Sequence, residues 1–476
     1  MKASVTYRIL TLAALVSFLL AVSLSGALAE VVGWRGDGTG VYPKATPPTT
    51  WAKDKNVVWS TPLPSWGNSC PVLVGDKLFF CVEPTTLMCL SATDGKILWQ
   101  KSNQYEDIAP ADQAATVKAE QAQLADLQKQ TQGVDDELAK VKVALEKTPA
   151  DETLKAKQTE LQTKREELNK QLQPLTKWIV PITHPTNGWS SPTPVSDGAH
   201  VWVAFGNGVV ACYDLDGNRV WARLVEKPQH GWGTSASPTL TDNKLLVQFV
   251  TLHGLNPATG ETFWNAKEVG MYWGSIITTN IGNVPVAITS NGFVVRAADG
   301  KILAKGLYGL SYNTPIIADG VLYFVEIPGW TRMAGRAFTL PTEAADSLTL
   351  KPVWNGRDER FYASPVYFEG LLYDVNQLDS LVVVDAANGL PIYEKKLGLG
   401  GTQYPSVTMA GQYIYVSSDS GATVVIEPGR EYKEIARNTL EPFRGSPVFS
   451  GDRMYIHGLK TFYCLANTPA AAPAAQ

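Results

Sequence analysis

The sequence predicts an all-β fold, an eight-bladed β-propeller of four-stranded antiparallel blades. Three observations predict it: a repeated set of strand-forming segments, turn signals at regular positions in each repeat, and an N-terminal strand that completes the last, shorter repeat. One such unit cannot bury its own apolar face. Units stacked around a ring bury a shared core, which is the propeller arrangement.

The repeat begins with a short strand near a Ser-Pro pair or its equivalent. A turn containing Gly or Asp follows, and then a second strand rich in Val, Leu, Phe and Tyr. The eight copies of this opening lie at residues 68–82, 189–205, 235–250, 273–289, 311–327, 361–375, 403–418 and 443–458.

The second half of each repeat contains two further strands. The third strand runs into a pair such as Asp94-Gly95 or Asp216-Gly217, which tolerates the positive φ of a tight hairpin. We expect the aromatic residues at the end of the fourth strands to pack blade against blade. They are Trp59, Trp99, Trp221, Trp264, Trp354 and, more loosely, Tyr393.

The ring closes through its N-terminal end. The eighth repeat stops after three strands, at Cys464-Leu465, whereas residues 56–60, with Trp59, resemble a fourth strand. We expect this segment to complete the last blade, because a closed ring leaves no exposed edge between first and last blades.

Residues 105–177 interrupt the repeat and predict a coiled-coil helical hairpin inserted in blade one. Asp151 is suited to cap the second helix. The hairpin is either a decorative surface insertion or an arm that binds a partner protein or a second copy. Its apolar residues follow helical spacing, and they are Leu124, Leu127, Val134, Leu138, Val141, Leu145, Leu154, Leu161, Leu168 and Leu175.

A second irregular segment, residues 328–350, lies inside blade five. There we expect a longer loop in place of the third strand. Residues 468–476 are rich in Ala and Pro and predict a disordered tail.

Residues 1–29 predict a cleaved secretory signal. A basic start with Lys2 and Arg8 is followed by an apolar run over residues 9–24 and by small residues at Ala27 and Ala29. The alternative is a membrane anchor, although the run is short of the roughly 20 residues that a span needs. We therefore expect a mature chain, residues 30–467 and tail, in the periplasm or cell envelope, not spanning a membrane.

Charge and cysteine content exclude some functions. The chain has 41 Lys and Arg against 45 Asp and Glu, without a basic stripe, so nucleic acid is a poor partner. No spacing of its five cysteines resembles a metal site. Cys81 and Cys89 flank a short turn and would form a disulfide if their geometry allows it.

The candidate binding residues stand just before the innermost strands. In a propeller such positions surround one mouth of the central channel. Aromatic faces and an arginine there would bind a planar ligand, a sugar or a peptide, although aromatics also pack blades together. No catalytic residues stand out, and only His230 among the histidines lies near the mouth. The candidates are Trp66, Trp189, Trp232, Trp273, Tyr312, Tyr362, Tyr404 and Arg444.

These features resemble a known family. The repeated Ser-Pro strand, the strand ends ATDGKILW and DLDGNRVW, and the opening WRGDGTGVYP at residues 34–43 are similar to the PQQ-binding-like β-propeller repeat proteins. The resemblance covers most of residues 34–467 apart from the hairpin. It implies an exported bacterial propeller related in repeat to quinoprotein alcohol dehydrogenases and to an outer-membrane assembly lipoprotein. A shared repeat specifies fold more than function.

The departures from that family concern chemistry. Quinoprotein dehydrogenases resemble one another in an adjacent cysteine pair and in Glu, Asn and Asp ligands to calcium. Here no two cysteines are adjacent and those ligand motifs cannot be placed. The lipoprotein's lipobox cysteine is also missing. We therefore expect a non-catalytic binding or scaffold propeller without cofactor. The alternatives are a PQQ-dependent oxidoreductase with calcium and a carbohydrate-binding propeller.

Overall fold

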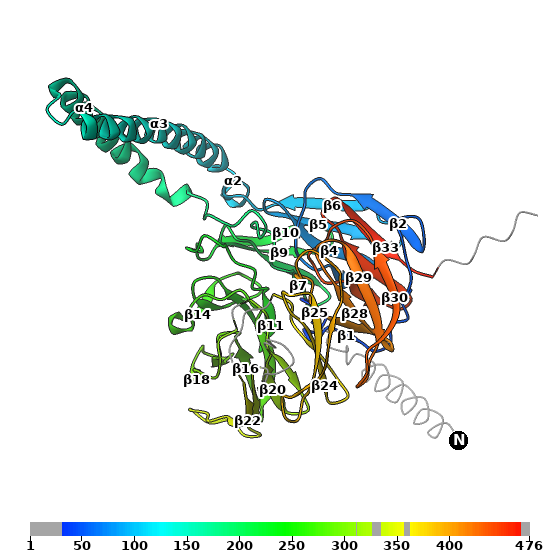
Figure 1. Cartoon of the computed structure of the whole chain (residues 1–476). Helices are drawn as coiled ribbons and strands as arrows, with labels where there is room; N and C mark the ends of the chain where they lie inside the picture. Colours follow the sequence, from blue (N-terminus) through cyan, green and yellow to red (C-terminus); the bar gives the residue numbers. More distant parts are fainter. Residues whose placement is uncertain (1–30, 311, 326–334, 357–361, 468–476) are drawn as a thin grey trace, which may run out of the picture.

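The fold is an eight-bladed propeller, which confirms the sequence prediction. The computed structural model describes residues 31–310, 312–325, 335–356 and 362–467. Their strands form eight antiparallel four-stranded sheets that follow one another along the chain (Figure 1), with one extra strand added to one of them. The first strands of neighbouring blades contact each other, so these strands line the central channel.

The strands follow the predicted order of four per blade. Those of blades one to four are β3 (Val72–Val74), β4 (Lys77–Val82), β5 (Thr86–Ser91), β6 (Ile97–Ser102), β7 (Val195–Ser196), β8 (His200–Ala204), β9 (Val209–Asp214), β10 (Arg219–Leu224), β11 (Thr239–Thr241), β12 (Lys244–Gln248), β13 (Leu252–Leu255), β14 (Thr262–Ala266), β15 (Ile277–Ile281), β16 (Val284–Ile288), β17 (Val294–Arg296) and β18 (Ile302–Ala304). Those of blades five to eight are β19 (Ile316–Ala318), β20 (Val321–Phe324), β21 (Arg336–Thr339), β22 (Lys351–Asn355), β23 (Val366–Phe368), β24 (Leu371–Val375), β25 (Ser380–Asp385), β26 (Pro391–Lys396), β27 (Thr408–Ala410), β28 (Tyr413–Ser417), β29 (Ala422–Glu427), β30 (Lys433–Thr439), β31 (Val448–Ser450), β32 (Arg453–His457) and β33 (Thr461–Leu465).

The N-terminal region closes the ring as predicted. Strand β2 (Val57–Pro62) pairs antiparallel with β33, and Trp59 lies opposite Cys464. Ahead of it, β1 (Val41–Tyr42) pairs in parallel with β27, the innermost strand of blade seven. Residues 31–42, ahead of β2, therefore lie along innermost strands within the channel.

The tryptophans of the fourth strands join neighbouring blades through one repeated contact. Each indole Nε1 donates to a backbone carbonyl of the next blade at 2.8–3.2 Å. Each ring also covers a glycine of that blade whose φ is positive, from +72° to +85°, and a Cβ there would come within 2.4–2.8 Å of a ring atom. Glycine is thus needed for both backbone and space. The pairs are Trp59–Gly95, Trp99–Gly217, Trp221–Gly260, Trp264–Gly300 and Trp354–Gly389.

The helical hairpin consists of α3 (Ala114–Lys147) and α4 (Glu152–Leu172), flanked by α2 (Tyr105–Ile108) and the short 3-10 helix η1 (Gln173–Trp178). Figure 1 shows α3 and α4 projecting from the ring, and α3 alone is about 51 Å long. The Asp151 carboxylate caps α4, accepting from the Thr153 and Leu154 N–H groups. The buried seam is made by Leu124, Leu127, Val134, Val141, Leu161, Leu168 and Leu175.

Two sequence expectations about these irregular segments differ from the structure. The hairpin follows β6, the fourth strand of blade one, and so lies in the connection to blade two rather than within a blade. Blade five keeps its third strand, because β21 pairs with both β20 and β22. The expected replacement by a loop was wrong, since the short β21 lacks the Asp-Gly or Asn-Gly pair that follows the third strand in blades one, two, four and six. Residues 1–29 and 468–476 lie outside the described residues.

The five cysteines are all free and buried. Cys81 lies opposite Leu87, and Cys89 lies opposite Phe79. The two cysteines are thus offset along the β4–β5 ladder instead of facing each other, and the disulfide that the sequence left open is not formed.

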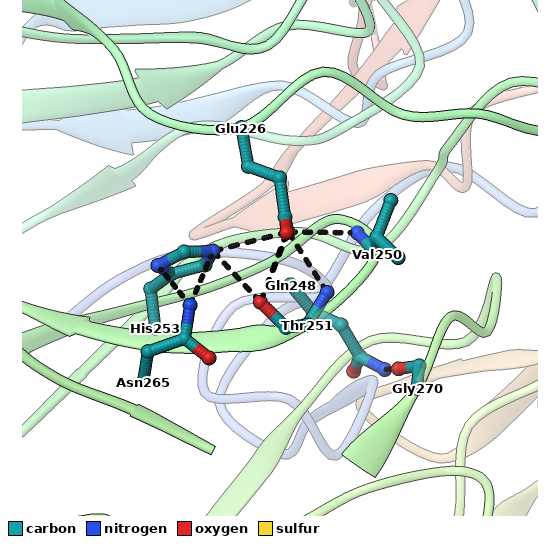
Figure 2. A network of polar contacts seen from close by, with 7 residues as sticks. All are labelled: Glu226, Gln248, Val250, Thr251, His253, Asn265 and Gly270. Atoms are coloured by element: carbon teal, nitrogen blue, oxygen red, sulfur yellow. Dashed lines mark hydrogen bonds and ion pairs between the residues drawn. The ribbon is translucent and has the colours of Figure 1, made fainter. Parts of the chain in front are cut away.

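Carboxylates supply a second kind of contact between blades. Glu226 follows β10 of blade two and accepts hydrogen bonds from Val250 N, Thr251 N and His253 Nε2 of blade three at 2.8–3.0 Å (Figure 2). Asn265 holds the other side of the imidazole. Burial opposes ionisation of Glu226, but the bonds from His253 and Thr251 outweigh it and lower the pKa of the carboxyl.

Glu226→Gln should destabilise the folded chain by about 1.5–3 kcal/mol at pH 7, because charge-assisted hydrogen bonds are lost. The lowered pKa makes this contribution complete above the ordinary pKa of 4.5 and lost as the pH falls through the folded-state value. Urea unfolding from pH 7 to pH 3 checks both statements. A gap between the two proteins that stays constant below pH 4.5 would contradict the assignment.

Candidate functional site

A closed belt of hydrogen bonds surrounds the channel where the innermost strands begin. In each blade, one backbone N–H donates to the side-chain oxygen of the equivalent residue in the next blade, at 2.8–3.2 Å, and Ser446 N closes the circle by donating to Cys70 Sγ. All eight residues are buried. This hydroxyl belt consists of Cys70, Thr193, Ser237, Ser275, Thr314, Ser364, Ser406 and Ser446.

The sequence builds the belt from its Ser-Pro repeat. A small side chain with an acceptor reaches the neighbouring blade without filling the channel. Proline follows the belt residue in six blades, as in Ser364-Pro365, and holds that residue extended. The Ser, Thr or Cys at this position of each repeat is therefore a connection between blades.

Ser364→Ala should cost about 1–3 kcal/mol of folding free energy, because the buried Thr314 N–H loses its acceptor. Ser364→Thr is the matched control, since threonine already occupies this belt position in two other blades. Urea unfolding measures the difference. Equal loss in both variants would mean that the side chain contributes packing and not the bond.

Above the belt, the channel mouth encloses a cavity of about 190 Å³. Four aromatic side chains form an arc along one side, each tilted against its neighbour. Ring centroids are 5.6 Å apart for Trp273 and Tyr312, 4.9 Å for Tyr312 and Tyr362, and 4.8 Å for Tyr362 and Tyr404. Burial raises the pKa of the Tyr362 and Tyr404 hydroxyls, so both remain protonated at neutral pH.

The opposite side of the mouth is polar and carries a cation. Arg444 donates through Nη1 to Thr186 O at 3.2 Å and lies 3.5 Å from Asn68 Oδ1. Its Nε is 3.8 Å from Asp419. His184 stacks on Trp232, with 4.3 Å between centroids, at the rim. The mouth therefore has an aromatic half and a hydrogen-bonding half that contains a guanidinium.

Trp34 forms the floor, and it comes from the segment that enters the channel from the far end. Next to it, Arg35 is fully buried and its Nη2 donates to Pro365 O and Val407 O at 2.9 and 2.5 Å. Burial lowers the pKa of this guanidinium to about 10, which leaves it charged at neutral pH. Burial also raises the pKa of the Cys70 thiol, which keeps it protonated.

The structure brings together most of the sequence-predicted residues. Trp189 does not line the cavity: its ring covers Gly206 and its Nε1 donates to Pro181 O. Trp66 stands behind Arg444, 5.7 Å from its guanidinium, and His230 packs against the edge of Trp273. Those that line the cavity are Trp232, Trp273, Tyr312, Tyr362, Tyr404 and Arg444.

Sequence reasoning missed Trp34, Asn68, His184 and Asn187, which also line the cavity. Trp34 lies in the WRGDGTGVYP segment, which served only to indicate a family. His184 and Asn187 follow the helical hairpin, where the repeat had not resumed. The recurring Ser-Pro pair is the sequence signal for the belt, because its small side chain carries a hydrogen-bond acceptor at the same position of the repeat.

A comparison with models of protein families shows which family this chain belongs to. Residues 48–142, 178–338 and 250–468 match the family of PQQ-like repeats described as outer membrane protein assembly factor BamB. The chain belongs to this family. No curated protein sequence matches it.

Solved structures of the PQQ-like family have the same fold. BamB from Moraxella catarrhalis superposes with a TM-score of 0.51 at 11% identity, covering 87% of this chain and 99% of that one. The quinohemoprotein alcohol dehydrogenase ADHIIG from Pseudomonas putida HK5 gives 0.52 at 11% identity, covering 91% and 80%. A europium-containing methanol dehydrogenase gives 0.51 at 12% identity, covering 87% and 88%. At these identities the likeness concerns the fold alone.

The described residues were also compared with what a membrane-spanning helix and a metal site require. None of their helices combines the length and apolar character needed to cross a bilayer. No group of three or more His, Cys, Asp or Glu side chains among them is arranged to hold a metal ion.

Proposed function

We propose that the chain is an exported, non-catalytic propeller of the periplasm or cell envelope that binds a ligand or protein partner at its channel mouth. The observation that carries the proposal is the two-sided cavity, with an aromatic arc facing Arg444 and backbone-held amides. Such a site favours a group with one flat or apolar face and one edge rich in acceptors or negative charge.

The lining residues favour binding over oxidoreduction. A quinone held by calcium needs carboxylate or amide oxygens around the ion. The residues lining the mouth in the described part of the chain include no Asp or Glu, and their only side-chain amides are those of Asn68 and Asn187. The Cys70 thiol, the one sulfur at the cavity, stays protonated and bonds within the belt. These oxygen and sulfur donors therefore fit a quinone held by calcium poorly.

Titration with PQQ and calcium tests the oxidoreductase alternative directly. We expect no change in the visible absorbance of the quinone and no reduction of an artificial electron acceptor when alcohols or sugars are added. A spectral change together with dye reduction would replace the binding proposal.

Site-directed photocrosslinking in intact cells tests the binding role. A benzoylphenylalanine at Tyr362, within the arc, should form an ultraviolet-dependent adduct. The same group at Phe263, exposed on the outer strand β14, is the matched control and should form none. Arg444→Ala should weaken the adduct at Tyr362. Absence of any adduct at Tyr362, or equal adducts at both positions, would refute a ligand site at the mouth.

A further inference from the structure

The channel contains a second cavity beyond the hydroxyl belt, which we call the far cavity. Its volume is about 490 Å³, within the usual range of ligand pockets. One side is formed by the channel segment, residues 31–41, and the other by β11, β15 and β19, the innermost strands of blades three to five. Trp34 lines both cavities and separates them.

The innermost strand of each blade has one edge that no other strand of its own blade pairs with, because it is the last of that blade's four strands. In an antiparallel pair, alternate residues direct their N–H and C=O groups away from the partner strand. The channel segment of the chain itself forms hydrogen bonds with two of these edges. Ser196 of blade two exchanges both backbone bonds with Val32, at 2.8 and 2.9 Å, and Met409 of blade seven donates to Gly40 O at 2.9 Å.

Both edge residues occupy one position in the repeat, three residues after the belt residue. The same position in blades three, four and five is held by Leu240, Thr278 and Ile317, and all three line the far cavity. For β15, the pairing with β16 independently indicates that the backbone N–H and C=O of Thr278 point into the channel. Asn280 lies opposite Pro285, which has no N–H, so Asn280 and Thr278 direct their backbone groups away from β16.

The lining of the far cavity is mostly apolar and has a single sign of charge. Ile276, Ile277, Ile316 and other aliphatic side chains surround the edges. Asp37 is the one charged residue among the described residues that line it, and it is exposed at the rim. A partner would therefore be extended, apolar at alternate positions and basic at the end beside Asp37.

We propose that the far cavity binds an extended segment of a partner polypeptide, which adds a strand to the inner edge of β15 as the channel segment does in blades two and seven. Main-chain bonds would supply affinity and the aliphatic walls would supply selection, as in other cases of strand addition. This site lies below Trp34 and does not depend on the function proposed for the mouth.

Proline substitution at the inner edge tests the proposal. Thr278→Pro removes the N–H that faces the cavity and leaves the β15–β16 ladder intact, as proline on an edge strand allows. Leu73→Pro is the matched control, because Leu73 holds the same repeat position in blade one and does not line the far cavity. Thr278→Phe, which enlarges a residue that lines the cavity and keeps its backbone N–H, serves if the proline variant does not fold.

The probe is a phage-displayed library of random dodecapeptides, panned on the full-length chain. We expect enriched peptides with alternating apolar residues and a basic residue at one end. Their affinity should fall about fivefold or more in Thr278→Pro and in Asp37→Asn, and stay unchanged in Leu73→Pro. Photocrosslinking at Tyr362 should be unaffected.

Three results would overturn the proposal. The first is a library without enriched sequences. The second is a set of peptides that bind Thr278→Pro and Thr278→Phe as well as the unaltered chain. The third is self-association of the chain that Thr278→Pro abolishes, because the occupant would then be a second copy.

Discussion

A chain shortened to residues 64–467 should be far less stable than one shortened to residues 51–467. Both lack the channel segment, but only the longer one keeps β2, which pairs with β33 and closes the ring. Without it, β33 becomes an exposed edge and the contact between Trp59 and Gly95 is lost. Losing the partly buried indole of Trp59 alone should cost about 3 kcal/mol.

Urea unfolding followed by tryptophan fluorescence and circular dichroism compares the two shortened chains. The longer chain keeps Trp51, which stacks on Tyr415, so it controls for removal of the channel segment. We expect a lower midpoint and a tendency to aggregate only in the shorter chain. Equal midpoints would show that the last blade is stable with three strands and that β2 does not close the ring.

Trp354→Ala should lower the free energy of unfolding by about 3–5 kcal/mol, since the side chain is buried and fills the gap between blades five and six. Trp354→Phe keeps much of the packing and loses the bond to Ala386 O, so its cost should be nearer 1 kcal/mol. Denaturant unfolding of both variants checks the order. A phenylalanine variant as unstable as the alanine variant would assign the stabilisation to the hydrogen bond.

The ring and its closure could be predicted from the sequence because their signals are local. A Ser-Pro strand, an Asp-Gly turn and a terminal tryptophan recur at similar spacing, and the Trp59 segment has the same form as the missing strand. The buried seam and the Asp151 cap of the hairpin were predictable for the same reason, since helical spacing and capping involve neighbours along the chain.

The features that were not predicted depend on contacts between distant parts of the chain. Ser406 and Ser446 each look like an ordinary turn residue, and only the folded ring brings one N–H to the other's hydroxyl. Trp34 reaches the mouth from the opposite end of the channel. Trp189 occupies a predicted mouth position, but its indole bonds to Pro181 in the loop after the hairpin and points away.

The hydroxyl belt also governs how many blades the ring can have. Every link runs in the same direction, from the backbone of one blade to the side chain of the next, and the eighth donor returns to Cys70. A duplicated or deleted blade would still offer a donor and an acceptor, but the angle between all neighbours would change and every link would lengthen or tilt. The geometry of the belt therefore favours a ring of eight blades. A gene duplication or deletion that changes the number of repeats should give a chain that folds poorly.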